Sequence, residues 1–335
     1  MDLNTAWFYL IGILFAGYAV LDGFDLGVGI LSLFSRDEKE RDIHMSAIAP
    51  VWDGNEVWLL AAGGALFAAF PKVYAAIFSG FYLALMLVLL CLILRAVSME
   101  FRSQVVSETA RKLWGWVFGL SSLVVSILFG VALGNILRGV PIDAAGNYTG
   151  TFFGLLNPLA LLMGVLSLTF FAMHGAAYMA LKTDGELKER MMRRGAKLVS
   201  AGLTVYVLCM VALFLKSSFL FSGKVLPWAA VAFTVVGFLV AWRGVNAGKA
   251  LATFLGTALV IIGITGTFGF GLYPMLAPSL TNPEFSLTAY NASSTPRTLS
   301  VMLWIALLGM PLVLTYTGVV YWAVRGKATG GYHHD

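Results

Sequence analysis

Apolar residues run through the chain in nine long stretches, and short polar segments separate these stretches from one another. A helix needs about 20 mostly apolar residues to cross the hydrocarbon core of a bilayer. The nine predicted membrane-spanning helices are 6–34, 46–70, 73–94, 113–137, 152–181, 198–215, 225–242, 250–276 and 299–324. The second is the least regular, because Pro50, Asp53 and Glu56 fall in its first third. The pattern indicates an all-α integral membrane protein that forms one polytopic domain over residues 1–335.

The composition agrees with a chain whose solvent is the bilayer. Hydrophobic residues make up 59% of the 335 positions and charged residues only 12%, whereas soluble domains have about 25% charged residues. The net charge of +5 does not indicate a nucleic-acid partner, because the basic residues form short clusters between apolar stretches. Cys91 and Cys209 lie inside apolar stretches, so we expect packing residues rather than disulfide partners or metal ligands.

The distribution of Lys and Arg predicts the orientation of the chain. Of the 22 basic residues, 17 follow the first, third, fifth and seventh stretches or lie in the C-terminal tail, and 5 lie in the other connections. Connections rich in Lys and Arg stay on the cytoplasmic side of a membrane. We therefore expect the N-terminus outside and the C-terminus in the cytoplasm, which requires an odd number of crossings.

Four acidic residues within the first two stretches are the strongest chemical signal. Asp22 and Asp25 are three residues apart, as are Asp53 and Glu56, so each pair shares a helix face. Asp22 lies roughly 18 Å from the inner end of its stretch. An ionised Asp at the centre of a membrane helix costs about 2.5–3.5 kcal/mol. Protonatable acids that lead from the cytoplasmic side into the bilayer are what a proton pathway needs.

Two interpretations of these acids are open at this point. They can carry protons, or they can serve structure alone by pairing with a base such as Arg95 or by capping the second helix. Ionisable residues inside a membrane are functional by default, which favours proton handling for Asp25 and Asp53. The two interpretations are balanced for Asp22 and Glu56. A proton-coupled transporter that uses the same acids around a substrate cavity is the alternative function.

The positions of the four histidines do not predict a haem-binding site. His44 lies in the first cytoplasmic connection, His333 and His334 lie in the C-terminal tail, and His174 alone lies within an apolar stretch. Bis-histidine ligation of a haem needs two facing imidazoles at membrane depth. We therefore expect His174 to be a hydrogen-bonded core or interface residue, and we expect no metal site and no catalytic nucleophile. Many Trp and Tyr residues, Tyr321 among them, lie near predicted helix ends, and most of these are interpreted as interface anchors.

Several segments, distributed over nearly the whole chain, resemble subunit II of the cytochrome bd ubiquinol oxidase family. The segments with the strongest resemblance are 22–29 (DGFDLGVG), 47–58 (AIAPVWDGNEVW), 61–71 (AAGGALFAAFP), 73–75 (VYA) and 78–82 (FSGFY). Shorter matches follow at 134–135, 139–141, 157–158, 286–288 and 292–294. The short connections on both sides resemble the cyanide-insensitive branch of the family.

The resemblance implies a heterodimeric oxidoreductase of the bacterial inner membrane. In that membrane the orientation expected from the basic residues gives a periplasmic N-terminus and a cytoplasmic C-terminus. The resemblance further implies two four-helix bundles plus one further helix. Subunit I would carry haems b and d, oxidise quinol and reduce oxygen to water. The present chain would be the haem-free partner with no catalytic residue of its own, and lipid, a structural quinone and a small accessory subunit are further candidate partners.

The resemblance also gives the acids a role. In the family, acids of these motifs are proposed to lead cytoplasmic protons toward the oxygen site. Asp22 and Asp25 match the acids of the first motif, and Asp53 matches the acid of the second. Glu56 stands where some relatives have a neutral Gln, which argues against an obligatory relay role there. The expected proton pathway is therefore formed by Asp22, Asp25, Asp53 and Glu56.

Overall fold

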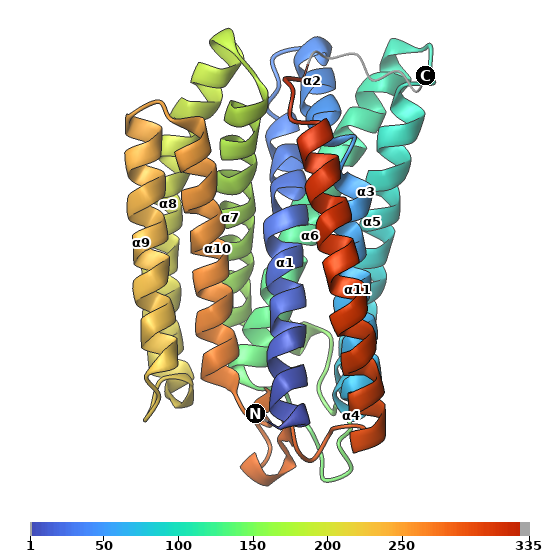
Figure 1. Cartoon of the computed structure of the whole chain (residues 1–335), viewed down its shortest axis with the longest axis vertical. Helices are drawn as coiled ribbons and strands as arrows, with labels where there is room; N and C mark the ends of the chain where they lie inside the picture. The colour runs from blue at the N-terminus through green and yellow to red at the C-terminus, as the bar shows by residue number, and fades with distance from the viewer. Residues whose placement is uncertain (1, 329–335) are drawn as a thin grey trace.

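The computed structural model describes residues 2–328 and consists mainly of long helices (Figure 1). Helices suit this sequence because a backbone in lipid must satisfy its hydrogen bonds within its own segment. The α-helices of the described residues are α1 (Leu3–Ser32), α2 (Glu38–Ile48), α3 (Trp52–Ala69), α4 (Pro71–Gly80), α5 (Tyr82–Arg102), α6 (Glu108–Arg138), α7 (Pro158–Lys182), α8 (Gly185–Lys216), α9 (Leu226–Asn246), α10 (Ala250–Leu272) and α11 (Pro296–Ala323). After α10, the short strands β1 (Met275–Ala277) and β2 (Leu287–Thr288) pair antiparallel.

Eight of these helices, α1 and α5 to α11, are long and apolar enough to cross a membrane. The predicted span 46–70 is shorter than expected, because α3 begins only at Trp52 and the preceding residues complete α2 and a turn. The predicted span 73–94 is wrong as one helix, since the backbone breaks at Phe81 between α4 and α5. At this break a Cβ atom on Gly80 would lie 2.4 Å from the ring of Tyr148, a contact that only glycine permits.

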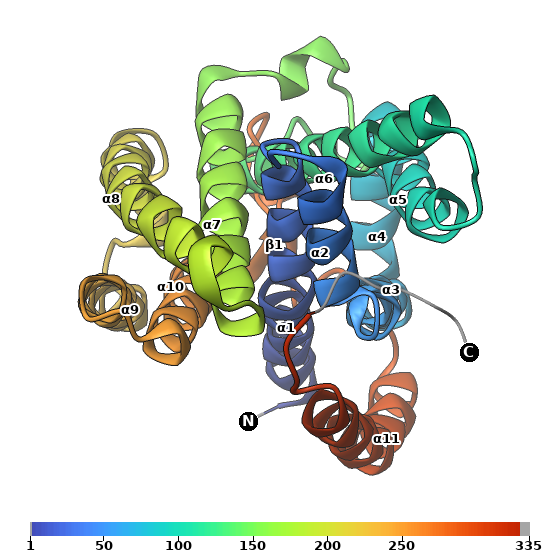
Figure 2. The same cartoon turned by 90° about the horizontal axis from the view of Figure 1, so that it is seen from above.

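When α3 is counted with the eight spans, successive helices run alternately up and down, and α1 begins and α11 ends at opposite ends of the bundle (Figure 1). Apart from Arg95, which lies inside α5, the 17 basic residues of the predicted cytoplasmic segments gather toward the end where α1, α5, α7, α9 and α11 finish, which is called the basic end below. Seen from above, α7 to α10 form one group, α1 and α3 to α6 form another, and α11 lies at the edge (Figure 2).

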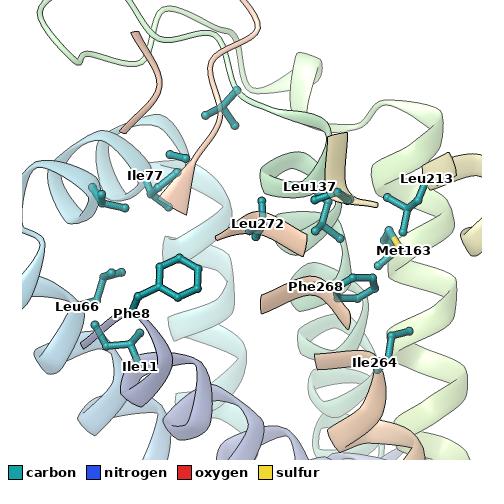
Figure 3. Close-up of a cluster of buried hydrophobic side chains, with 14 of the residues drawn as sticks. Phe8, Ile11, Leu66, Ile77, Leu137, Met163, Leu213, Ile264, Phe268 and Leu272 are labelled. Atoms are coloured by element: carbon teal, nitrogen blue, oxygen red, sulfur yellow. The ribbon is translucent and has the colours of Figure 1, made fainter. Parts of the chain in front are cut away.

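The core extends along the bundle with α1 near its centre. Gly27 of α1 meets Gly175 of α7 so closely that a Cβ atom on Gly27 would lie 1.8 Å from the backbone oxygen of Phe171. Such backbone contact between membrane helices depends on small residues. Figure 3 shows part of the largest apolar cluster, in which Phe8 and Phe268 are buried. Cys91 and Cys209 are free and buried, as expected of packing residues.

Candidate proton-transfer site

The two acids of α1 face α5 and α3 inside the bundle, and both side chains are completely buried. Asp22 and Asp25 are each 0% exposed. Their spacing of three residues brings both carboxyl groups to the same side of α1. From the neighbouring helices, α5 contributes Arg95, which is also 0% exposed, and α3 contributes Asn55, which is 1% exposed. These four polar side chains form the centre of the candidate site.

Asp22 is held by Arg95 in a two-pronged ion pair. The Arg95 Nη1 atom donates to Asp22 Oδ2 at 3.0 Å, and Nη2 donates to Oδ1 at 2.5 Å. Two parallel hydrogen bonds between charged groups are the strongest arrangement that a guanidinium and a carboxylate can form. Asp22 therefore has the structural pairing with Arg95 that the sequence offered as an alternative to proton transfer.

Asp25 has a different environment, because only one of its oxygens is held. The Asn55 Nδ2 atom donates to Asp25 Oδ2 at 2.8 Å, and Arg95 Nη2 lies 3.9 Å from the same oxygen. The second oxygen, Oδ1, is buried and has no hydrogen-bond partner among the described residues. A buried carboxylate oxygen without a partner is costly, which distinguishes Asp25 from Asp22, whose two oxygens are both held by Arg95.

Asn55 connects Asp25 to the last helix of the chain. Besides Asp25, its Nδ2 atom donates to the backbone oxygen of Leu21 at 3.3 Å. Its Oδ1 atom accepts a hydrogen bond of 2.9 Å from the hydroxyl of Tyr321 in α11. The three contacts agree on one orientation of the amide group. Tyr321 is therefore part of the site, a contact that the interpretation as an interface anchor did not foresee.

The two acids of α3 lie nearer the surface of the chain than Asp22 and Asp25 do. Asp53 is exposed on the first turn of α3, whereas Glu56 is half-buried. Glu56 is close enough to interact electrostatically with Arg95, Asp22 and Asp53. The structure thus brings Asp22 and Asp25 into one cluster, places Glu56 beside it, and leaves Asp53 on the outer surface of this chain. Their role in proton transfer stays a prediction.

Sequence reasoning missed Asn55 and Tyr321. Asn55 carried a usable signal, because a polar amide in a membrane helix needs a hydrogen-bonding partner. Tyr321 carried none, since it lies 266 residues from Asn55 and resembles any aromatic residue near a helix end.

His174 is a hydrogen-bonded core residue, as expected. Its Nε2 atom lies 3.1 Å from the backbone oxygen of Val20, and its Nδ1 atom lies 2.7 Å from the Thr257 hydroxyl. A carbonyl oxygen only accepts, so Nε2 carries a proton and donates to Val20. The Thr257 hydroxyl beside Nδ1 also lies 2.8 Å from the backbone oxygen of Phe254, to which it donates. Neither nitrogen is free for a haem iron. Within residues 2–328 no three His, Cys, Asp or Glu side chains form a metal site, and His333 and His334 lie outside the described residues.

Comparison with known proteins decides the family. The sequence profile described as "Cytochrome bd terminal oxidase subunit II" matches residues 3–324. The chain belongs to the cytochrome bd oxidase subunit II family. It is 38% identical to "Cytochrome bd-I ubiquinol oxidase subunit 2" of Escherichia coli (strain K12), over 98% of this chain and 95% of that protein. It is 34% identical to "Cytochrome bd ubiquinol oxidase subunit 2" of Bacillus subtilis (strain 168), over 98% and 97% of the two chains.

The fold of this bd oxidase subunit is also found in a solved structure. The bd oxidase from Geobacillus thermodenitrificans matches with a TM-score of 0.78 and 19% sequence identity, over 98% of this chain and 100% of that chain. The resemblance seen in the sequence is therefore confirmed. As a member of the family, the chain is a multi-pass inner-membrane subunit of a respiratory oxidoreductase. The match over nearly the whole length favours this function over a proton-coupled transporter.

Proposed function

We propose that this chain is the haem-free second subunit of a quinol:oxygen oxidoreductase, and that it stabilises subunit I and supplies it with cytoplasmic protons. In this proposal, haems b and d and the oxidation of quinol belong to subunit I. The observation that carries the proposal is the environment of Asp25. This fully buried carboxyl group has one oxygen held by Asn55 and one oxygen without a partner among the described residues.

The position of the acids supports a route that opens toward the cytoplasm. The basic end is the cytoplasmic end by the positive-inside rule. Because α3 begins at this end, Asp53 and Glu56 in its first two turns lie close to the cytoplasm. Glu56 then lies between the exposed Asp53 and the buried cluster around Asp25. Protons would enter at Asp53 and Glu56 and pass to Asp25, while Asp22 serves as the counter-ion of Arg95.

The outer faces of α3 and α11 are the proposed contact with subunit I. Glycines on these faces have open space where a Cβ atom would lie, with no described atom within 4 Å: Gly54, Gly63 and Gly64 on α3, and Gly309 and Gly318 on α11. Their apolar neighbours Val57 and Leu60 are 51% and 71% exposed in this chain. Small residues on a membrane helix permit a second helix to approach closely. A partner on this face would also cover Asp53.

The substitution Asp25→Asn in the assembled oxidase tests the proton route. The amide cannot take up a proton, so quinol-dependent oxygen consumption per haem should fall at least tenfold, a modest loss for a proton-transfer group. Asp53→Asn should cause a smaller loss. Asp184→Asn, the same change at an exposed residue of the basic end, is the control and should leave turnover unchanged.

Assembly distinguishes the proposed role from a structural one. Haem content and subunit stoichiometry should be normal in Asp25→Asn, since the asparagine keeps the shape of the side chain. Normal turnover in this assembled variant would overturn the proton route. Loss of assembly with normal turnover in the remaining complex would also contradict it, and would assign Asp25 a structural role.

A further inference from the structure

We infer that Tyr321 is a positioning residue for proton transfer at Asp25, and that it acts through Asn55. The inference rests on the proposed proton route and extends it to α11. The Tyr321 hydroxyl donates to Asn55 Oδ1 at 2.9 Å, and Asn55 Nδ2 donates to Asp25 Oδ2 at 2.8 Å. Tyr321 thereby reaches the buried carboxyl group without touching it.

The hydroxyl stabilises the one amide orientation that serves Asp25. In this orientation the amide nitrogen faces two acceptors, Asp25 Oδ2 and the backbone oxygen of Leu21. The amide oxygen faces the opposite way and accepts from Tyr321. Without the hydroxyl, this buried oxygen would lose its donor, and an unsatisfied buried acceptor is costly. Asn55 would then turn toward another donor, and its N–H group would move away from Asp25.

The contacts indicate positioning rather than a relay of protons through Tyr321. An amide group does not titrate, so Asn55 cannot pass a proton from Tyr321 to Asp25. What the chain of hydrogen bonds can do is hold one carboxylate oxygen in place. Asp25 Oδ1, which has no partner among the described residues, is then the oxygen that exchanges the proton.

The attachment of α11 suits this task. Within Pro296–Ala323 only Leu299, near the opposite end of the helix, is buried, so α11 is otherwise a peripheral helix. Just beyond Tyr321 the chain is tied to α7. The Lys182 Nζ atom donates to the backbone oxygen of Val324 at 2.5 Å, and the backbone N–H of Ala328 donates to the Lys182 oxygen at 2.8 Å. This tie keeps the end of α11, and with it the Tyr321 hydroxyl, against α3.

Tyr321→Phe in the whole oxidase tests the inference, because it keeps the ring beside Phe24 and removes only the hydroxyl. We expect turnover per haem to fall about fivefold, as for loss of one hydrogen bond at a reacting group. The infrared carboxyl band of Asp25 in redox difference spectra, assigned by its absence in Asp25→Asn, should shift. Tyr82→Phe is the matched control, since this tyrosine at the start of α5 is 58% exposed and lies outside the proposed contact with subunit I, so both readouts should stay unchanged.

A double-mutant cycle shows whether the hydroxyl acts through Asn55. In an Asn55→Ala background, Tyr321→Phe should cause no further loss of turnover, and additive losses would overturn the inference. Unchanged turnover and an unchanged carboxyl band in Tyr321→Phe would also overturn it. The proposed proton route would survive that result if Asp25→Asn remained slow, whereas normal turnover in Asp25→Asn refutes the route itself. Turnover and spectra are normalised to assembled haem, so that reduced assembly does not obscure the outcome.

Discussion

Replacing Arg95 by Met would remove the buried positive charge that holds Asp22. The methionine fills most of the same volume, so the main effect is the loss of two charge-assisted hydrogen bonds, at 2.5 Å and 3.0 Å, from a fully buried carboxylate. Breaking a buried ion pair by removing one partner costs about 3–5 kcal/mol. A typical protein has only about 5–15 kcal/mol of net stability. We therefore expect a large fall in the yield and thermal stability of the complex.

The double variant Asp22→Leu/Arg95→Met separates the charge effect from the packing effect. Replacing a whole buried ion pair by apolar residues is often neutral or stabilising by about 1–4 kcal/mol. The double variant should therefore regain most of the stability that Arg95→Met loses. Thermal inactivation of the purified oxidase and its haem yield per membrane protein measure this recovery. Lys197→Met, at an exposed residue of α8, is the control. An Arg95→Met complex as stable as the parent, or a double variant no better than the single one, would refute the reasoning.

Two further predictions concern helix packing and pH. Gly27→Ala would place a methyl group 1.8 Å from the Phe171 oxygen and should prevent assembly, whereas Gly12→Ala meets no described atom within 4 Å and should assemble normally, as judged by subunit levels in membranes. Burial lowers the pKa of His44, in the connection between α1 and α3, from 6.5 to about 4. Between pH 6.5 and 4, His44 binds a proton in the unfolded chain but stays neutral in the folded chain. The free energy of unfolding therefore falls by on the order of 3 kcal/mol over this range. His44→Gln should flatten this acid loss in thermal melts, and equal pH slopes would contradict the assignment.

The helices could be predicted from the sequence because membrane spans depend on local composition. Interruptions were harder to foresee where a distant residue causes them. The break at Phe81 lies beside the contact of Gly80 with Tyr148, which belongs to a connection far along the chain. The turn at residues 49–51 could have been recognised, since Pro50 and the acids after it do not suit the start of a long span.

The candidate site could be predicted only in part. The cost of a charge in the membrane identifies Asp22 and Asp25, and it also identifies Arg95 as a partner. Which acid takes that partner depends on where the Arg95 side chain of α5 reaches α1, and the sequence spacing does not show this. The contribution of Tyr321 depends on α11 lying against α3, and neither helix carries a local pattern that pairs it with the other.

The charges around Arg95 explain how two acids only three residues apart can have different tasks. Arg95 supplies one positive charge, and both of its terminal nitrogens are used by Asp22. Asp25 receives a weaker attraction at 3.9 Å and one hydrogen bond from a neutral amide. Its negative charge is therefore only partly compensated in a site that excludes solvent. Of the two acids, Asp25 is therefore the one that we propose to pass protons, because its charge has the weaker partners.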